Sequence, residues 1–304
     1  MIILNKKIKT LSENLSNIDP VKGRSLWHDA RIRFFKNKAA LTSLFLLICV
    51  LLFTFIGPIF AQWSNEEIDW SVLGDISTLG YPSIESGHYF GTDELGRDLY
   101  SRVIQGTKIS LMVGIVGALI AVTVGTIYGS IAGYFGGRID SVMMRIVDIL
   151  MSIPYMFVLI LLLVIFGRSI LMLFVGIGLV SWLDMARIVR GQTLSIKKKE
   201  YVEAAITIGV NHFVIIRRHI IPNLLGVVAV YATLLVPGMI LTESFISFLG
   251  LGVQEPNTSW GALISEGAGT MRYGTLWQLL FPLFFFVISL FFDINLRLEI
   301  FFLK

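Results

Sequence analysis

EYVEAAITIGVNHFVIIRRHIIPN, Glu200–Asn223, is a charged stretch between two long apolar segments. Its first part predicts a short helix that ends in a turn at Gly209, because glycine readily adopts the positive φ of such turns. Asn211 is a favoured N-cap residue, so a second, amphipathic helix is expected from His212 to Ile221. Pro222 lacks a backbone N–H and is expected to bend the chain into the next apolar segment. The stretch therefore predicts a helix–turn–helix that is joined directly to a membrane-spanning helix.

The composition indicates a membrane protein. Of the 304 residues, 55% are hydrophobic and 15% are charged, whereas soluble domains contain roughly 25% charged residues. The only cysteine, Cys49, lies in an apolar run, so no disulfide can form within the chain. The positive charge is concentrated in a few segments, which favours membrane topology over nucleic-acid binding. We expect no secretory signal, because the N-terminal region is polar and basic.

Six apolar segments are expected to cross the membrane as helices, which predicts an all-α, polytopic fold. They are Ala39–Ala61, Ile109–Tyr134, Ile146–Phe166, Ile170–Met185, Asn223–Phe248 and Leu276–Phe292. The first would span about 34 Å at about 1.5 Å per residue, enough for a bilayer. The third is interrupted by Pro154, and the fifth contains Pro237.

The polar segments divide the chain into a tail and a transmembrane domain. The tail, residues 1–38, is expected to contain an amphipathic helix that leads into the first span, and the transmembrane domain covers 39–304. Within this domain we predict an external loop at 62–105, a cytoplasmic loop at 187–222 and an external loop at 250–274.

Lysine and arginine residues concentrate on one side of the predicted spans. That side carries Lys6, Lys7, Lys9, Lys22, Arg24, Arg31, Arg33, Lys36, Lys38, Arg138, Arg145, Arg187, Arg190, Lys197, Lys198, Lys199, Arg217 and Arg218. The opposite side carries only Arg97, Arg102, Lys108, Arg168 and Arg272. Because cytoplasmic loops are enriched in Lys and Arg, both termini and the 187–222 loop are expected in the cytoplasm.

The order of residues in the quoted stretch resembles the signature loop of permease subunits of bacterial ABC importers. The matching residues are Glu203, Ala204, Ala205, Gly209 and Pro222, and the HIIPN ending is similar to the peptide-transporting branch. SLWHDARIRFFKNKAA, HYFGTDELGRDLYSR, SWLDMARIVRGQTLS and LTESFISFLGLGVQEPNTSWGALISEGA also resemble this family, in order along the chain. The resemblance is closest to the C-type permease subunit of oligopeptide and dipeptide importers. The end of the chain, from about residue 293, departs from the family's usual closing pattern.

The resemblance implies a type I ABC importer permease fold and a place in the bacterial inner membrane. It implies as partners a second homologous permease, two cytoplasmic ATPase subunits that hold ATP and Mg, a periplasmic or extracellular peptide-binding protein, a peptide substrate and membrane lipid. No nucleic acid, catalytic residue, cofactor or metal site is expected in this chain. Coupling to the ATPases is implied for Glu203, Ala204, Ala205, Gly209, Arg217 and Pro222.

Other interpretations of these features stay open on the sequence. The 187–222 region could be an ordinary surface helix with its basic face on anionic lipid. Small residues at Ala204 and Ala205, with Ile208, are instead expected to share one side of a helix and allow close docking. The chain could also be a secondary transporter or channel that works alone, or a membrane-embedded enzyme, although no inverted repeat or convergent nucleophile is evident.

The segment from Gly91 to Gly96 has the glycine spacing of a phosphate-binding loop. Arg97 and Asp98 follow it where such a loop has Lys and Ser or Thr. We therefore expect a capped surface helix here, with ATP hydrolysis in another chain. The four histidines His28, His88, His212 and His219 do not have metal-ligand spacing.

Small and ionisable residues within the spans are further candidates. Gly125, Gly129 and Gly133 recur every four residues, which favours close helix packing, within this subunit or against a partner permease near the pathway. Asp148 and Asp184 are expected to pair locally, with Arg145 and Arg187 respectively.

Glu243 has no cation near it in sequence. It is either a pathway residue or a hydrogen-bonding residue that contacts a neighbouring helix.

Overall fold

The computed structural model describes residues 35–301, with side chains for 35–290 except residue 40. By its contacts the chain divides into Met1–Thr42 and Ser43–Lys304, and the following description concerns the second unit. The amphipathic helix expected within 1–38 lies outside the described residues, apart from the first positions of α3. In the described part of the chain all regular structure is helical, with two isolated β-bridges and no strand.

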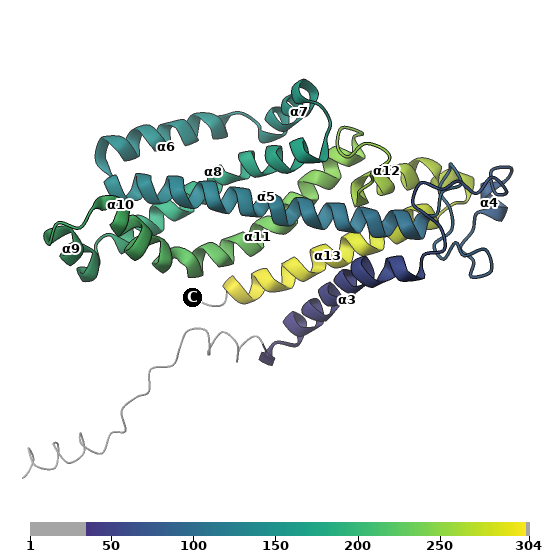
Figure 1. Cartoon of the computed structure of the whole chain (residues 1–304), viewed down its shortest axis with the longest axis horizontal. Helices are drawn as coiled ribbons and strands as arrows, with labels where there is room; N and C mark the ends of the chain where they lie inside the picture. The colour runs from purple at the N-terminus through teal and green to yellow at the C-terminus, as the bar shows by residue number, and fades with distance from the viewer. Residues whose placement is uncertain (1–34, 302–304) are drawn as a thin grey trace, which may run out of the picture. The chain divides into compact units, whose positions relative to one another are not determined.

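The helices follow one another in the order shown in Figure 1. They are α3 (Lys38–Phe60), α4 (Ile76–Leu79), α5 (Leu99–Phe135), α6 (Gly137–Ser152), α7 (Tyr155–Phe166), α8 (Ile170–Ile196), α9 (Glu200–Thr207), α10 (His212–Ile215), the π-helix η1 (Ile216–Ile220), α11 (Ile221–Phe248), α12 (Trp260–Thr270), the 3₁₀-helix η2 (Met271–Tyr273) and α13 (Trp277–Phe301).

Helix α5 forms the centre of the bundle and packs along α8. A Cβ atom at Gly129 would lie 2.4 Å from the carbonyl oxygen of Ala186, and one at Gly133 would lie 2.7 Å from Cβ of Thr193. A Cβ atom at Gly125 would lie 2.6 Å from Cβ of Met185. The three glycines of the sequence pattern therefore face α8 of the same chain, where only a missing side chain allows the two backbones to approach this closely.

Four described helical regions are long and apolar enough to cross a membrane. They are Leu41–Phe60, Leu99–Phe135, Ile170–Ile196 and His212–Phe248. α6 and α7 form a fifth candidate as one broken span, bent by 80°, and Trp277–Leu290 is a shorter apolar helix. The break occurs because Pro154 lacks an N–H and disfavours helical backbone at Ile153, which has φ −86° and ψ 127°.

Two predicted loops were too long because helices continue past the apolar segments. α5 begins at Leu99, not at Ile109, since the Asp98 side chain accepts a hydrogen bond from the backbone N–H of Ser101 and caps the helix. α8 continues past Met185 to Ile196, and α9 and α10 then follow as the two short helices expected within the 187–222 loop. Hydropathy marks the apolar part of a helix, whereas capping and hydrogen bonding decide where it ends.

The expected bend at Pro222 is also wrong. Pro222 lies in the first turn of α11, and the helical run from His212 to Phe248 is continuous. The π-helix Ile216–Ile220 immediately precedes this turn, and in a π-helix the backbone hydrogen bonds span five residues instead of four. The missing N–H of a proline is tolerated in a first turn, so the chain enters α11 without a break.

Candidate functional site

The turn after α9 has the backbone geometry that the sequence predicts. Gly209 has φ +78°, and no described atom lies within 4 Å of the place where its Cβ would be. The backbone N–H groups of Gly209 and Val210 donate to the carbonyls of Ile206 and Ala205, at 3.0 and 3.1 Å. Asn211 caps α10 by accepting from the N–H of Phe213 at 2.9 Å. The turn is therefore set by local hydrogen bonds and by a glycine conformation that other residues adopt with strain.

The two faces of α9 have different surroundings. Val202 and Ala205 are buried in a cluster with residues of η1 and α11, whereas Glu203, Ala204 and Ile208 are exposed. The expectation that Ala204, Ala205 and Ile208 share one side is wrong. Adjacent residues point about 100° apart on a helix, and the chain has left the helix at Ile208. Ala205 therefore packs within this chain and is not available for docking.

Tyr134 fastens the turn to the end of α5 and also contacts the end of α8. The hydroxyl of Tyr134, at the end of α5, lies 2.7 Å from Nδ1 of His212 in α10. Nζ of Lys197, which caps α8, lies 5.5 Å from the centre of the Tyr134 ring, in cation–π range. The sequence does not predict this contact, because no short spacing relates Tyr134 to His212.

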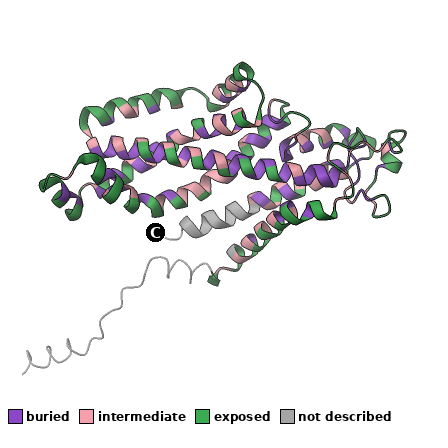
Figure 2. Cartoon of the chain, viewed as in Figure 1, coloured by how far each residue is buried: buried purple, intermediate pink, exposed green. Residues whose placement is uncertain are grey.

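Apolar side chains are exposed around the turn. Ile208 is 78% exposed and Phe213 is 68% exposed, with Tyr201, Ile206 and Val214 also accessible beside them. Figure 2 shows that much of the surface of α9 and α10 is exposed, in contrast to the buried positions along α5. Arg217 and Pro222 are exposed as well. Several exposed apolar side chains close together in sequence favour contact with another protein or with lipid.

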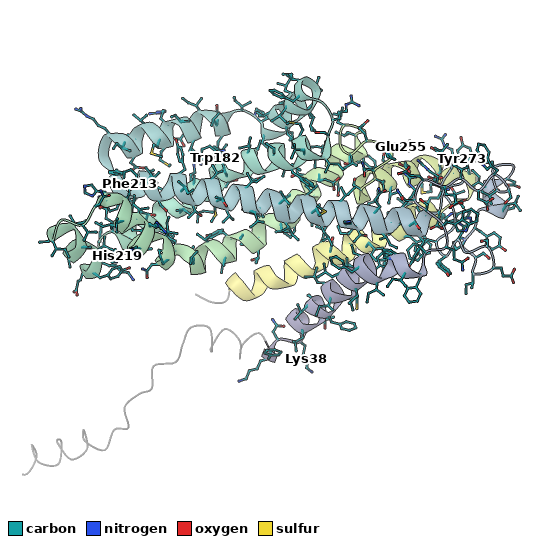
Figure 3. The ribbon with its side chains drawn as sticks, in the orientation of Figure 1. Lys38, Trp182, Phe213, His219, Glu255 and Tyr273 are labelled. Carbon is teal, nitrogen blue, oxygen red and sulfur yellow. The ribbon has the colours of Figure 1, made fainter. Side chains whose placement is uncertain are left out.

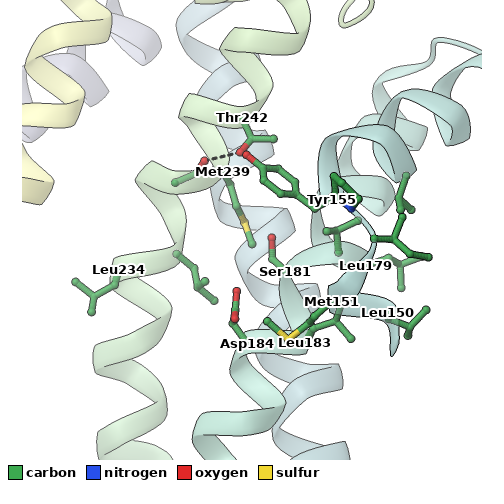
Figure 4. A pocket seen from close by; sticks show the side chains of 16 residues that line it. Leu150, Met151, Tyr155, Leu179, Ser181, Leu183, Asp184, Leu234, Met239 and Thr242 are labelled. Carbon is green, nitrogen blue, oxygen red and sulfur yellow. Dashed lines mark hydrogen bonds between the residues drawn. The ribbon is translucent and has the colours of Figure 1, made fainter. Parts of the chain in front are cut away.

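A cavity of about 590 Å³ lies between the α6–α7 break, α8 and α11. Figure 4 shows Ser181 and Asp184 on α8, Met239 and Thr242 on α11, and Tyr155 beside the break. The predicted pair between Asp184 and Arg187 is absent from the described residues, because Arg187 forms an ion pair with Asp148 of α6. The predicted pair between Asp148 and Arg145 is also wrong, because the Asp148 carboxylate pairs with Arg187 of the facing helix α8 instead.

Glu243 lies in a closed hydrogen-bond cluster, not in this cavity. Its side chain is 0% exposed and accepts from the hydroxyls of Ser110 at 2.9 Å and Ser247 at 2.7 Å. Ser110 in turn accepts from the backbone N–H of Trp260 at 3.2 Å. Glu243 therefore joins α5, α11 and α12, as expected of a buried carboxylate that needs hydrogen-bond donors.

The chain belongs to a known family. Residues 125–298 match the family described as "Binding-protein-dependent transport system inner membrane component", and residues 25–74 match "N-terminal TM domain of oligopeptide transport permease C". The chain is a member of the binding-protein-dependent transport family.

Curated relatives extend this match over most of the chain. The oligopeptide transport system permease protein OppC of Escherichia coli is 56% identical, over 95% of this chain and 94% of that one. OppC of Haemophilus influenzae is 54% identical, over 89% and 85%. The dipeptide transport system permease protein DppC of Bacillus subtilis is 44% identical, over 90% and 84%.

Membership of the binding-protein-dependent transport family decides between the functions that the sequence left open. The family consists of inner membrane components of transport systems that depend on a binding protein. This chain is therefore a transport component of the inner membrane, and a secondary transporter or channel that works alone is ruled out.

The end of this binding-protein-dependent transport component opposite to α9 contains a network of paired charges (Figure 1). Arg102 is 2% exposed and pairs with Asp93 and with Glu266, whose Oε2 lies 2.8 Å from Nη1. His88 lies between Asp98, at 3.0 Å, and Asp69, at 3.3 Å. Burial alone would lower the pKa of His88, but hydrogen bonds and the negative charges of Asp98 and Asp69 outweigh it, so this pKa is raised.

The glycine-spaced loop from Gly91 to Gly96 lies within this network. Its interior is occupied by the Asp93 carboxylate, which accepts from the backbone N–H groups of Leu95 and Arg97 at 2.8 and 2.9 Å. Those N–H groups would have to bind a phosphate in a nucleotide site, and the carboxylate would repel it. Within the described residues, no group of three or more His, Cys, Asp or Glu side chains could hold a metal ion.

Proposed function

We propose that the chain is a transmembrane permease subunit of an ATP-driven oligopeptide importer and forms half of its translocation pathway. The relatives named as oligopeptide and dipeptide permeases support the substrate class. Six spans with both termini in the cytoplasm are part of this proposal. The Lys and Arg distribution supports it, and so does the sequence of four long apolar helices, one broken pair and the shorter apolar helix Trp277–Leu290.

The segment from Glu203 to Pro222 couples this subunit to cytoplasmic ATPases in the proposed mechanism. The observation that carries the proposal is the combination of an exposed apolar surface at Ile208 and Phe213 with a turn fastened to α5 through Tyr134. A partner that docks on the surface can pull on the helices through the continuous run from α10 into α11. Glu203, Ala204, Gly209, Arg217 and Pro222 are exposed and available to such a partner, whereas Ala205 supports the turn from inside.

The proposed assembly contains a second homologous permease, two ATPase subunits that bind ATP and Mg, and a peptide-binding protein outside the membrane. ATP hydrolysis is assigned to the partners because Asp93 fills the phosphate-loop-like segment of this chain. No cofactor is assigned to this chain itself.

Purification with mass spectrometry tests the assembly. We expect the tagged full chain to recover a second permease and two ATPase subunits from bacterial membranes, and the reconstituted complex with its binding protein to take up labelled peptide when ATP is supplied. Glu203→Lys should reduce the recovery of the ATPase subunits at normal abundance of the permease. A chain that transports peptide without any ATPase subunit would contradict the proposal.

A further inference from the structure

Asp184 lies at the end of the apolar part of the membrane-spanning helix α8 and has no partner among the described residues. α8 runs from Ile170 to Ile196, so Asp184 is roughly 20 Å from either end at about 1.5 Å per residue. Arg187, the nearest cation along the helix, pairs with Asp148. An unpaired charge within a span is costly, and such residues commonly mark transport pathways. Asp184 is exposed, and it lines the cavity between the α6–α7 break, α8 and α11.

The cavity walls that face Asp184 are mostly apolar. Met151 and Pro154 belong to the break between α6 and α7, and Leu235 and Met239 come from α11. Its volume of about 590 Å³ is within the range of about 300–1,000 Å³ that is usual for small-molecule sites. No lysine, arginine or histidine lines it. The cavity therefore offers space for an apolar side chain beside a single negative charge.

The aliphatic hydroxyl groups of Ser181 and Thr242 present only acceptor atoms to the cavity. Figure 4 shows Ser181 near Asp184 on α8, and Thr242 farther away beside Tyr155. Ser181 donates its hydroxyl hydrogen to the carbonyl of Ile177 at 2.9 Å. Thr242 donates to the carbonyl of Gly238 at 2.9 Å, as the dashed line in Figure 4 shows. With their single hydrogens used within their own helices, both oxygens can only accept further hydrogen bonds. The carboxylate of Asp184 and the acceptor hydroxyl of Ser181 near it fit a group with several N–H donors and a positive charge.

We propose that Asp184, with Ser181 one helical turn before it, forms a position in the pathway that accepts the primary ammonium group of a peptide in transit. This inference rests on the proposed peptide-transport function. An ammonium group has three N–H donors and no acceptor, which suits the carboxylate of Asp184 and the acceptor hydroxyl of Ser181. A divalent cation fits less well, because it requires more oxygen ligands than one carboxylate supplies. The ammonium group can come from the peptide's N-terminus or from a lysine side chain.

Photo-cross-linking in the purified complex tests this position. Three tripeptides carry a diazirine-bearing first residue: one has a free N-terminus, one is N-acetylated, and one is N-acetylated with lysine at its second position. The binding protein is left out, so that its own selectivity is not measured. We expect the free peptide to label Met151, Tyr155 or Met239, and the acetylated peptide to label them about tenfold less, the loss expected for one charged hydrogen-bonded contact. Labelling by the lysine peptide shows whether a side-chain ammonium group is also accepted.

Variants separate the charge of Asp184 from its structural effects. Asp184→Asn should reduce labelling by the free peptide to the level of the acetylated one, and Asp184→Glu should retain most of it. The matched control, Glu94→Gln, removes an exposed carboxylate that does not line the cavity, and it should label like the parent.

Two results would overturn the position. They are equal labelling by free and acetylated peptides in the parent, and unchanged labelling in Asp184→Asn. Equal loss for every peptide in Asp184→Asn, together with poor recovery of the second permease, would instead assign Asp184 to subunit contact. Peptide uptake by the parent complex with its binding protein is measured in parallel. If the parent complex takes up peptide but the free and acetylated peptides label it equally, only this inference fails. If the parent complex takes up no peptide, the proposed function fails.

Discussion

The two ends of the bundle differ in how they use charged side chains. Near α12, Arg102 is buried between Asp93 and Glu266, and His88 is enclosed by Asp69 and Asp98. At the α9 end, Ile208, Phe213 and Arg217 are exposed. Figure 3 shows Glu255 and Tyr273 near α12 and, at the opposite end, Phe213 and His219. The charged network of the first end is paired within the chain, whereas the second end leaves Ile208, Phe213 and Arg217 on a surface that a partner can cover.

Removal of one charge from the buried network should have the largest effect on stability. Arg102→Ala leaves Asp93 with a buried negative charge that has lost a partner, and such losses typically cost about 3–5 kcal/mol. We expect a marked fall in abundance and in the midpoint of thermal unfolding. Both are measured in detergent, and unfolding is monitored by size-exclusion chromatography. Lys108→Ala, an exposed cation of the same helix, is the control and should leave both unchanged. An Arg102→Ala protein of normal thermal stability would mean that this end does not depend on its ion pairs.

Gly209→Val should abolish coupling and leave the bundle intact. A β-branched residue strongly resists φ +78°, although the space around Gly209 is open within this chain. We expect peptide uptake to fall by more than about tenfold at normal membrane abundance, with lower recovery of ATPase subunits. Gly209→Asn is the matched control, since Asn tolerates positive φ better, and it should retain more uptake. Normal peptide uptake by the Gly209→Val protein would show that the turn has no role in coupling.

Tyr134→Phe tests whether the turn must be fastened to α5. The change removes the hydroxyl that lies 2.7 Å from His212 and keeps the aromatic ring beside Lys197. Loss of one such hydrogen bond costs roughly 1 kcal/mol, so uptake per complex should fall a few-fold, with ATP hydrolysis less dependent on peptide. The measurement is the ratio of peptide taken up to ATP hydrolysed. An unchanged ratio would show that the buried apolar cluster alone holds the turn.

The raised pKa of His88 predicts a modest dependence of stability on pH at the other end. The stabilisation is fully present below the unfolded-state pKa of about 6.5 and is lost as pH rises through the raised folded-state value. The difference in thermal unfolding midpoint between the parent and His88→Gln should therefore be larger at about pH 5.5 than at about pH 9. A difference that is constant with pH would mean that His88 contributes as a neutral hydrogen-bonding residue.

Pro222→Ala should have the smallest effect of these changes. Pro222 lies in the first turn of α11, where a missing backbone N–H is tolerated. The helical run on both sides of Pro222 is already continuous. Uptake and abundance are expected to stay near the parent values in the same assay as for Gly209→Val. A large loss of uptake would show that the proline stiffens the connection between the coupling turn and α11.

The sequence by itself determined the features that depend on neighbours along the chain. The apolar segments predicted a helical membrane protein, Gly209 and Asn211 predicted the turn and its cap, and the ordered motifs indicated the transport family that the comparisons show. Each of these depends on a short window of residues, because helix periodicity, capping and positive φ are local properties.

Only the tertiary structure decided which side chains meet across helices. It paired Arg187 with Asp148, left Asp184 facing a cavity, and enclosed Glu243 among hydroxyl groups. It also turned Ala205 inward and brought Tyr134 to His212. These contacts depend on how far each helix extends and how it is rotated against its neighbours. Packing of the whole bundle sets both, and no spacing within one segment contains that information.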